Sequence, residues 1–199
     1  MKTGRWLLVA ALISSLLFAA TFEGFTQSQP DAKATTREAA YRANNIGVAL
    51  LEQYKYPDAV KEFRRALGLA PKLVMAQINL AIALFYAGEY DAAQREAKAA
   101  ETVAPNAPQV DYTLGLIAKV QNRPADAMAA FKRVLDIDPR DPGANINLGQ
   151  LYKQQRDFAS AMVSFRRAIE TEPYNTTAMY GLGLTLMQSG QREEGMRVM

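Results

Sequence analysis

The sequence predicts an all-α protein built from stacked antiparallel helix pairs, and three observations lead to this fold class. A stretch of nine residues ending in proline recurs every 34 residues, as "FRRALGLAP", "AKAAETVAP", "FKRVLDIDP" and "FRRAIETEP". Small residues recur at the same interval, and proline, glycine and aspartate separate the segments between them. A fixed period of about 20 to 50 residues is typical of proteins that stack one small unit many times.

Counting positions from Ala40 gives four complete units and a partial fifth, in an array that spans residues 37–199. The units are residues 40–73, 74–107, 108–141, 142–175 and 176–199. Each unit repeats one pattern of large and small residues. Positions 7 and 8 are Ile46 and Gly47, Leu80 and Ala81, Leu114 and Gly115, Leu148 and Gly149, and Leu182 and Gly183. Position 20 is Ala59, Ala93, Ala127 and Ala161, and position 24 is Phe63, Ala97, Phe131 and Phe165.

This pattern predicts two antiparallel helices in each unit. Small residues at positions 8 and 20 let two helices approach closely, while the side chain at position 24 fills the space beside them. In the second unit, positions 8 and 24 are both alanine, as Ala81 and Ala97. We therefore expect weaker packing in that unit without a change of fold.

Turn and capping residues indicate where the helices begin and end. Pro139 is predicted to close one helix, Asp141 to cap the next, and Pro142 to occupy its first position, where a missing N–H is tolerated. Thr35 and Glu38 have the spacing of a capping box, so the first helix of the array is predicted to begin there.

The composition excludes several classes of function. Cysteine and histidine are both absent, which removes disulfides, thiolate nucleophiles, imidazole bases and ordinary zinc sites. Lys2 and Arg5 lie in the first 22 residues, which hold no acid, so the rest of the chain has a nearly balanced charge. Proteins that bind nucleic acid carry a concentrated basic surface. We therefore predict no nucleic-acid partner and no cofactor.

The acidic stretch "DIDPRDPG" is interpreted as a helix cap rather than a calcium site. Arg140 occupies the fifth position of such a loop and Asn147 the twelfth, where calcium binding needs a bidentate Glu. Glu193 and Glu194 are adjacent on a predicted helix and point about 100° apart, which suits a paired acid and base poorly. The sequence therefore predicts no metal site, no catalytic residue and no enzyme activity.

Residues 1–22 have the layout of a targeting segment: a basic start, an apolar middle and small residues at the end. The alternative is an uncleaved anchor formed by residues 6–22, although a spanning helix usually needs about 20 apolar residues. Either way, we expect the rest of the chain to be exported. It would be periplasmic or secreted, or it would be held at the inner membrane by the anchor. Residues 23–36 show no apolar period and are predicted to be a flexible linker.

The repeated residues resemble the tetratricopeptide repeat (TPR) family. Its pattern places L-G, a large residue three positions later, then A, F or Y, and P on a 34-residue period, and the resemblance covers residues 40–199. It implies a right-handed α-solenoid of antiparallel helix pairs. Position 4, often tryptophan in the family, departs from the pattern, being Ala43, Gln77, Asp111, Asn145 and Met179 here.

The resemblance also implies a peptide-binding groove. Positions 2, 5, 6, 9, 12 and 13 lie opposite positions 4, 7, 8 and 11 on a helix, and in the family the first set lines the concave groove. From these positions we select the residues predicted to bind a partner and call them the groove face. They are Tyr41, Asn44, Asn45, Val48, Met75, Ile78, Asn79, Ile82, Phe85, Tyr86, Tyr112, Leu116, Lys119, Ile146, Asn147, Gln150, Lys153, Tyr180, Leu184 and Met187.

The apolar character of the groove face predicts a protein or peptide partner, because soluble proteins rarely expose large contiguous apolar patches. Asn45, Asn79 and Asn147 are expected to bind the partner's backbone amides. The alternative is that neighbouring helices, or a further segment of the chain, cover part of this face.

Two other features of the repeats are considered as ligand sites, and neither indicates one. The family's clamp for carboxyl-terminal peptides needs a basic residue at position 5 of one unit and basic residues at positions 2 and 6 of the second unit after it, where this chain has Asn44, Gln109 and Thr113. A clamp of that kind is therefore not expected. A basic column at positions 25 and 26 is interpreted as a solvated face. It consists of Arg64, Arg65, Lys98, Lys132, Arg133, Arg166 and Arg167.

The sequence thus predicts a non-catalytic scaffold on the cell-envelope side that binds a peptide or protein segment in its groove. Two alternatives remain. The chain could be the non-catalytic TPR region of a longer multidomain enzyme or assembly factor whose active domain follows residue 199. It could also self-associate through an uncapped C-terminal end of the array.

Overall fold

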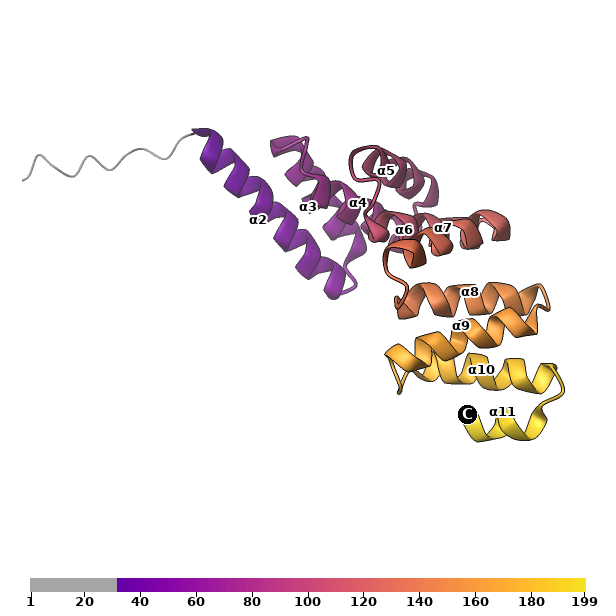
Figure 1. Cartoon of the computed structure of the whole chain (residues 1–199). Helices are drawn as coiled ribbons and strands as arrows, with labels where there is room; N and C mark the ends of the chain where they lie inside the picture. Colours follow the sequence, from indigo (N-terminus) through magenta and orange to yellow (C-terminus); the bar gives the residue numbers. More distant parts are fainter. Residues whose placement is uncertain (1–31) are drawn as a thin grey trace, which may run out of the picture. The chain divides into compact units, whose positions relative to one another are not determined.

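The structure, a computed structural model, describes residues 32–199, and within this range it is entirely helical apart from short turns (Figure 1). The targeting segment and residues 23–31 of the predicted linker lie outside the described residues. The compact unit of the array spans Thr36–Met199. The helices are α2 (Ala32–Glu52), α3 (Tyr56–Leu69), α4 (Val74–Tyr86), α5 (Tyr90–Val103), α6 (Pro108–Val120), α7 (Pro124–Ile137), α8 (Pro142–Gln154), α9 (Phe158–Thr171), α10 (Thr176–Gln188) and α11 (Arg192–Val198).

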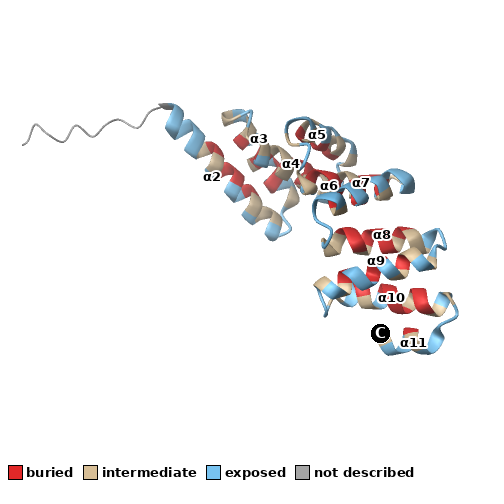
Figure 2. Cartoon of the chain, in the orientation of Figure 1, coloured by how far each residue is buried: buried red, intermediate tan, exposed pale blue. Residues whose placement is uncertain are grey.

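These helices form the expected pairs. Each unit contributes two consecutive helices and the turn between them. Within the array, helices that are consecutive in the chain pack against each other from α3 to α11, and α4 also contacts α6, as α8 contacts α10. Buried residues lie where paired helices face each other, and exposed residues lie on the outer sides (Figure 2). None of the described helices is long and apolar enough to cross a membrane.

The start of the first helix differs from the prediction. Helix α2 begins at Ala32, so residues 32–36 of the predicted flexible linker are helical, and the proposed capping box at Thr35 and Glu38 lies inside the helix. Alanine and lysine are strong helix formers, and the sequence "AKA" at the start of α2 extends the helix towards the N-terminus.

The break at the two prolines is confirmed. Helix α7 ends at Ile137, and α8 begins at Pro142. Asp141 is the N-cap residue, and its side chain accepts a hydrogen bond of 2.6 Å from the backbone N–H of Ala144. The carboxylate thereby satisfies one of the free N–H groups at the start of the helix.

Close contact between a glycine and a phenylalanine holds the two helices of a unit together. A Cβ atom added to Gly47 would lie 2.6 Å from the Phe63 ring, and one added to Gly115 would lie 2.8 Å from the Phe131 ring. In the second unit the corresponding residues, Ala81 and Ala97, are both buried. The two alanines therefore compensate for each other. The smaller residue at position 24 leaves room for the Cβ atom that alanine has at position 8 and glycine lacks.

Position 15 of every unit lies in the turn between the paired helices and has a left-handed backbone. The φ angles are 59° at Tyr54, 82° at Gly88, 55° at Asn122, 63° at Arg156 and 94° at Gly190. Glycine adopts this conformation freely and asparagine tolerates it, whereas other residues are strained there. The stacked helices therefore impose one turn geometry whichever residue occupies the position.

We predict that the effect of Gly115→Ala on stability changes sign with the residue at position 131. In the native protein the substitution should lower the free energy of unfolding by about 1–3 kcal/mol, because the added methyl overlaps the Phe131 ring. In a Phe131→Ala background it should raise stability by up to about 1 kcal/mol, because alanine is the better helix former. Urea denaturation of the four proteins of the cycle measures both values. Equal effects in the two backgrounds would contradict the proposed contact.

We also predict opposite effects for exchanges at position 15. Arg156→Gly should raise the free energy of unfolding by up to about 1 kcal/mol, because it relieves a left-handed non-glycine residue. Gly88→Arg should lower it by about 1–2 kcal/mol for the converse reason. Gly68→Ala, within α3 where an added Cβ meets nothing within 4 Å, serves as a helical control. If both exchanges at position 15 changed the free energy of unfolding in the same direction, backbone strain would not explain their effects.

Candidate functional site

The first helices of the second, third and fourth units enclose an open cavity of about 370 Å³. Five groove-face residues from α4 and α6 line it, namely Ile82, Phe85, Tyr86, Tyr112 and Leu116. The remaining lining residues come from the first half of α6, from the N-cap of α8 and from its first turn, and they are not among the groove-face residues. They are Pro108, Gln109, Thr113, Asp141, Pro142 and Gly143.

Aromatic contacts fix the walls of this cavity. The Tyr86 ring stacks on Tyr56 with the ring centroids 5.3 Å apart. Phe85 lies 5.7 Å from Tyr90, and Tyr112 packs edge-on against Phe131 at 5.5 Å. Aromatic rings held by neighbouring rings lose little further freedom when a ligand arrives, and they offer large apolar surfaces to it.

A chain of polar side chains extends from the cavity along α6 and α8. Asn147 donates hydrogen bonds to the carbonyl oxygen of Gly143 at 2.9 Å and to the Tyr112 hydroxyl at 3.2 Å. Its amide oxygen accepts a hydrogen bond of 2.7 Å from the Lys119 amine, which also donates to Gln150 Oε1 at 2.6 Å. Asn147 thus links a wall of the cavity to a lysine on the same face.

Burial changes the acid–base properties of the two ionisable groups in this chain. It lowers the pKa of the Lys119 amine, because the partly buried ammonium has lost part of its hydration. Burial also raises the pKa of the Tyr112 hydroxyl, and the nearby Asp141 carboxylate adds to that effect. Both shifts reflect a groove floor that is partly removed from water.

The expectation that Asn147 binds a partner's backbone is not supported. Asn147 is buried, and both of its amide hydrogens are bonded within the fold. Asn44 is also buried, and its oxygen accepts a hydrogen bond of 3.0 Å from Asn79. Both asparagines instead join the first helix of one unit to that of the next, whereas Asn45 is exposed.

The other groove-face residues are at least partly exposed, but several also contribute to the core. Val48 packs against the buried cluster around Phe63, Ile78 against that around Ala97, and Ile146 against that around Phe165. Neighbouring helices therefore cover part of the groove face. Outside the cavity and its polar chain, the partly or fully exposed members are Tyr41, Asn45, Val48, Met75, Ile78, Asn79, Ile146, Lys153, Tyr180, Leu184 and Met187.

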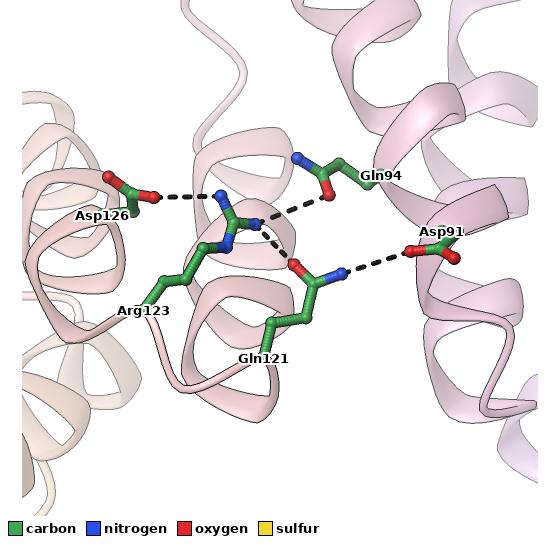
Figure 3. A network of polar contacts seen from close by, with 5 residues as sticks. All are labelled: Asp91, Gln94, Gln121, Arg123 and Asp126. Carbon is green, nitrogen blue, oxygen red and sulfur yellow. Dashed lines mark hydrogen bonds and ion pairs between the residues drawn. The ribbon is translucent and has the colours of Figure 1, made fainter.

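The outer side has different chemistry. A cavity of about 310 Å³ between α5, α6 and α7 is lined largely by charged and amide side chains. Arg123 pairs there with Asp126 at 2.9 Å and donates a hydrogen bond to Gln121 at 2.5 Å (Figure 3). Gln121 in turn donates to Asp91 on α5 at 3.4 Å. These contacts tie the turn after α6 to the preceding unit, so we assign this network to stability.

Part of the basic column is also paired within the fold. Arg65 bonds to Glu62, and Arg166 bonds to Glu194. Arg133 bonds to Asp111 with Nε and Oδ1 2.6 Å apart. These pairs agree with its interpretation as a solvated face. In residues 32–199, no three acidic side chains lie together in an arrangement that suits a metal ion.

Comparison with known families confirms the resemblance. Residues 39–70, 78–142 and 142–175 each match a tetratricopeptide repeat family, and these segments together span more than half of the chain. The chain belongs to the tetratricopeptide repeat family. No curated protein matches the sequence.

Solved TPR proteins share the fold of the array. A crystal structure of MamA has a TM-score of 0.67 and 19% identity, and the match covers 81% of this chain and 88% of that one. TTC0263 from Thermus thermophilus has a TM-score of 0.67 and 19% identity, with coverages of 80% and 88%. YrrB, described as a TPR protein with an unusual peptide-binding site, has a TM-score of 0.63 and 19% identity, with coverages of 84% and 89%. At these identities the likeness shows the all-α solenoid fold, and family membership supports a role in protein interactions.

Proposed function

We propose that this TPR protein is a non-catalytic interaction scaffold of the cell envelope. It binds a segment of a protein partner on the groove face, around the cavity between α4, α6 and α8. The observation that carries the proposal is the cavity itself, which is open, lined mainly by apolar groups and walled by fixed aromatic rings. Sites of this kind bind large apolar side chains and are usually formed before the ligand arrives.

The size of the cavity suits one or two side chains. Full burial of a Leu, Ile, Phe or Met side chain contributes about 1.5–3 kcal/mol. Such an anchor would dominate a small interface, because a few buried residues carry most of the binding free energy. The partly exposed groove-face residues on either side of the cavity then supply weaker contacts along the segment.

The proposed location rests on the sequence of residues 1–22. A basic start followed by an apolar stretch and small residues is the arrangement that directs export. We propose that the array is either released into the periplasm or medium after cleavage, or held at the inner membrane by residues 6–22. In both cases the groove meets partners outside the cytoplasm.

We predict that blocking the cavity abolishes partner binding. Gln109 is exposed and lines the cavity, so Gln109→Trp should fill the space without removing a core contact. Tyr86→Ser should remove one exposed wall. Each should weaken binding by about tenfold or more, because loss of one buried apolar anchor removes about 1.5–3 kcal/mol. The measurement is recovery of partners from cell-envelope extract on the immobilised full chain.

The matched control changes Val103, Val163 and Tyr174 to serine. These residues are exposed and lie outside the groove face, and the triple variant should retain binding. If the cavity variants recovered the same partners at native helicity, the groove would not be the binding site. If the native chain recovered no partner, the array would act as a spacer instead.

We predict that residues 1–36 direct export. Fused to a reporter enzyme that needs disulfides for activity, they should give an active reporter, because disulfides form outside the cytoplasm. Replacing Leu8 and Leu16 by arginine should abolish reporter activity by interrupting the apolar stretch. Mass spectrometry of the reporter's N-terminus then distinguishes a cleaved signal from an anchor. An inactive fusion would overturn the proposed location and leave the groove proposal intact.

A further inference from the structure

Two lysines are the charged residues of the groove face, and they occupy the same position in consecutive units. Lys119 on α6 and Lys153 on α8 are both position 12, 34 residues apart, and both are partly exposed. Among the ion pairs of residues 32–199, neither lysine has a carboxylate partner. Helices α4, α6, α8 and α10 carry one other charged residue, Asp111, which is buried and bonded to Arg133.

The ammonium group of Lys119 is held in a fixed place. It has three N–H donors, and two of them are directed to the oxygens of Asn147 and Gln150, at 2.7 and 2.6 Å. The Asn147 side chain is itself fixed by hydrogen bonds to the Gly143 carbonyl and the Tyr112 hydroxyl. One donor of a positioned, partly buried cation therefore remains for a ligand.

The single acid that lines the cavity lies away from this lysine. Asp141 caps the start of α8, whereas Lys119 contacts α8 at Asn147 and Gln150, which are six and nine residues further along. At a rise of about 1.5 Å per residue, the lysine contacts are about 9–13 Å further along the helix axis. The groove is thus mainly apolar at the cavity, with the Asp141 carboxylate at one end of it, and positive further along α8.

We propose that the partner segment is acidic as well as apolar. A large apolar side chain fills the cavity, and an Asp or Glu close to it in the same segment accepts a hydrogen bond from Lys119, with Lys153 as a second positive charge. This inference rests on the proposed function, because it names the chemistry of a ligand in the same groove. Burial disfavours the charged form of the Lys119 amine, and a carboxylate bound beside it would favour that form again, because an opposite charge stabilises the ionised amine.

The inference is tested by selecting a displayed random peptide library on the full chain. Peptides selected on the native chain should be enriched in Asp or Glu at a fixed spacing from a large apolar residue. A synthetic copy of a selected peptide should bind about five- to tenfold more weakly when its acid is replaced by the amide, or when Lys119 is replaced by methionine. Lys119→Arg keeps the charge and should retain most of the affinity.

The matched control is the Lys98→Met and Lys132→Met double variant, which removes two positive charges from the outer helices and should leave the affinity unchanged. Lys119→Met with Lys153→Met removes the same charge from the groove face and should abolish the enrichment in acids. Raising salt from about 0.1 M to about 1 M shortens the Debye length from about 10 Å to about 3 Å. It should weaken the native complex more than the complex of the groove-face double variant.

The outcomes separate the two proposals. Peptides that compete at the cavity but show no acidic enrichment, or that bind the groove-face double variant equally well, would overturn the inference and leave the groove function standing. If no peptide is selected, or if Gln109→Trp leaves binding unchanged, both proposals fail. If sedimentation shows that the native chain is a dimer that Lys119→Met dissociates, a second copy occupies the groove and the inference is wrong.

Discussion

The contact between position 8 and position 24 determines how the rest of each unit is arranged. Where a phenylalanine ring lies directly against a glycine of the facing helix, the two helices must be close and their relative rotation is fixed. That rotation turns position 8 towards the core and leaves positions 9 and 12 on the other face of the first helix. The contact recurs in the first, third and fourth units and is replaced by an alanine pair in the second. Successive units therefore present the same face, and their side chains can combine into one groove.

The fold was largely predictable because its main signals are local and repeated. Proline and aspartate at fixed positions end and cap helices wherever the chain lies, so the boundary around Pro139 and Pro142 was predicted correctly. The beginning of α2 was missed because the capping residues at Thr35 and Glu38 were outweighed by the strong helix formers before them. The left-handed turns were also missed. Glycine and asparagine at three of the five sites carried a signal, but Tyr54 and Arg156 gave none.

The candidate site was predictable only in part, for a different reason. The groove face follows from the helical period, and it supplied the aromatic wall residues of the cavity. The cavity itself depends on the helix ends of the next units, such as Gly143, whose approach to α6 is set by stacking between units. The hydrogen bonds of Asn147 within the fold were not predicted because its partners, Tyr112 and Lys119, are 35 and 28 residues away in the chain. Position on a helix face does not reveal whether an amide is already bonded by a neighbouring unit.

The chemistry that we propose for the partner combines two kinds of interaction at adjacent places. Apolar burial in the cavity supplies affinity but discriminates weakly between large apolar side chains. The Lys119 ammonium beside the cavity would add a requirement for an acidic residue, which most apolar segments lack. Together they would select a small class of sequences without any one strong contact.

The alanines of the second unit distinguish the helix pair beside the cavity. The buried face of α5 consists of Ala93, Ala97 and Ala100 alone, so this helix is held without a large interlocking side chain. Its pair partner α4 supplies Ile82, Phe85 and Tyr86 to the cavity. No phenylalanine fills position 24 between α4 and α5, in contrast to the units built on Phe63, Phe131 and Phe165, and the rings of Phe85 and Tyr90 meet across this pair at 5.7 Å. The cavity therefore lies beside the one complete unit whose paired helices meet through alanines and the Phe85–Tyr90 contact, without a phenylalanine at position 24.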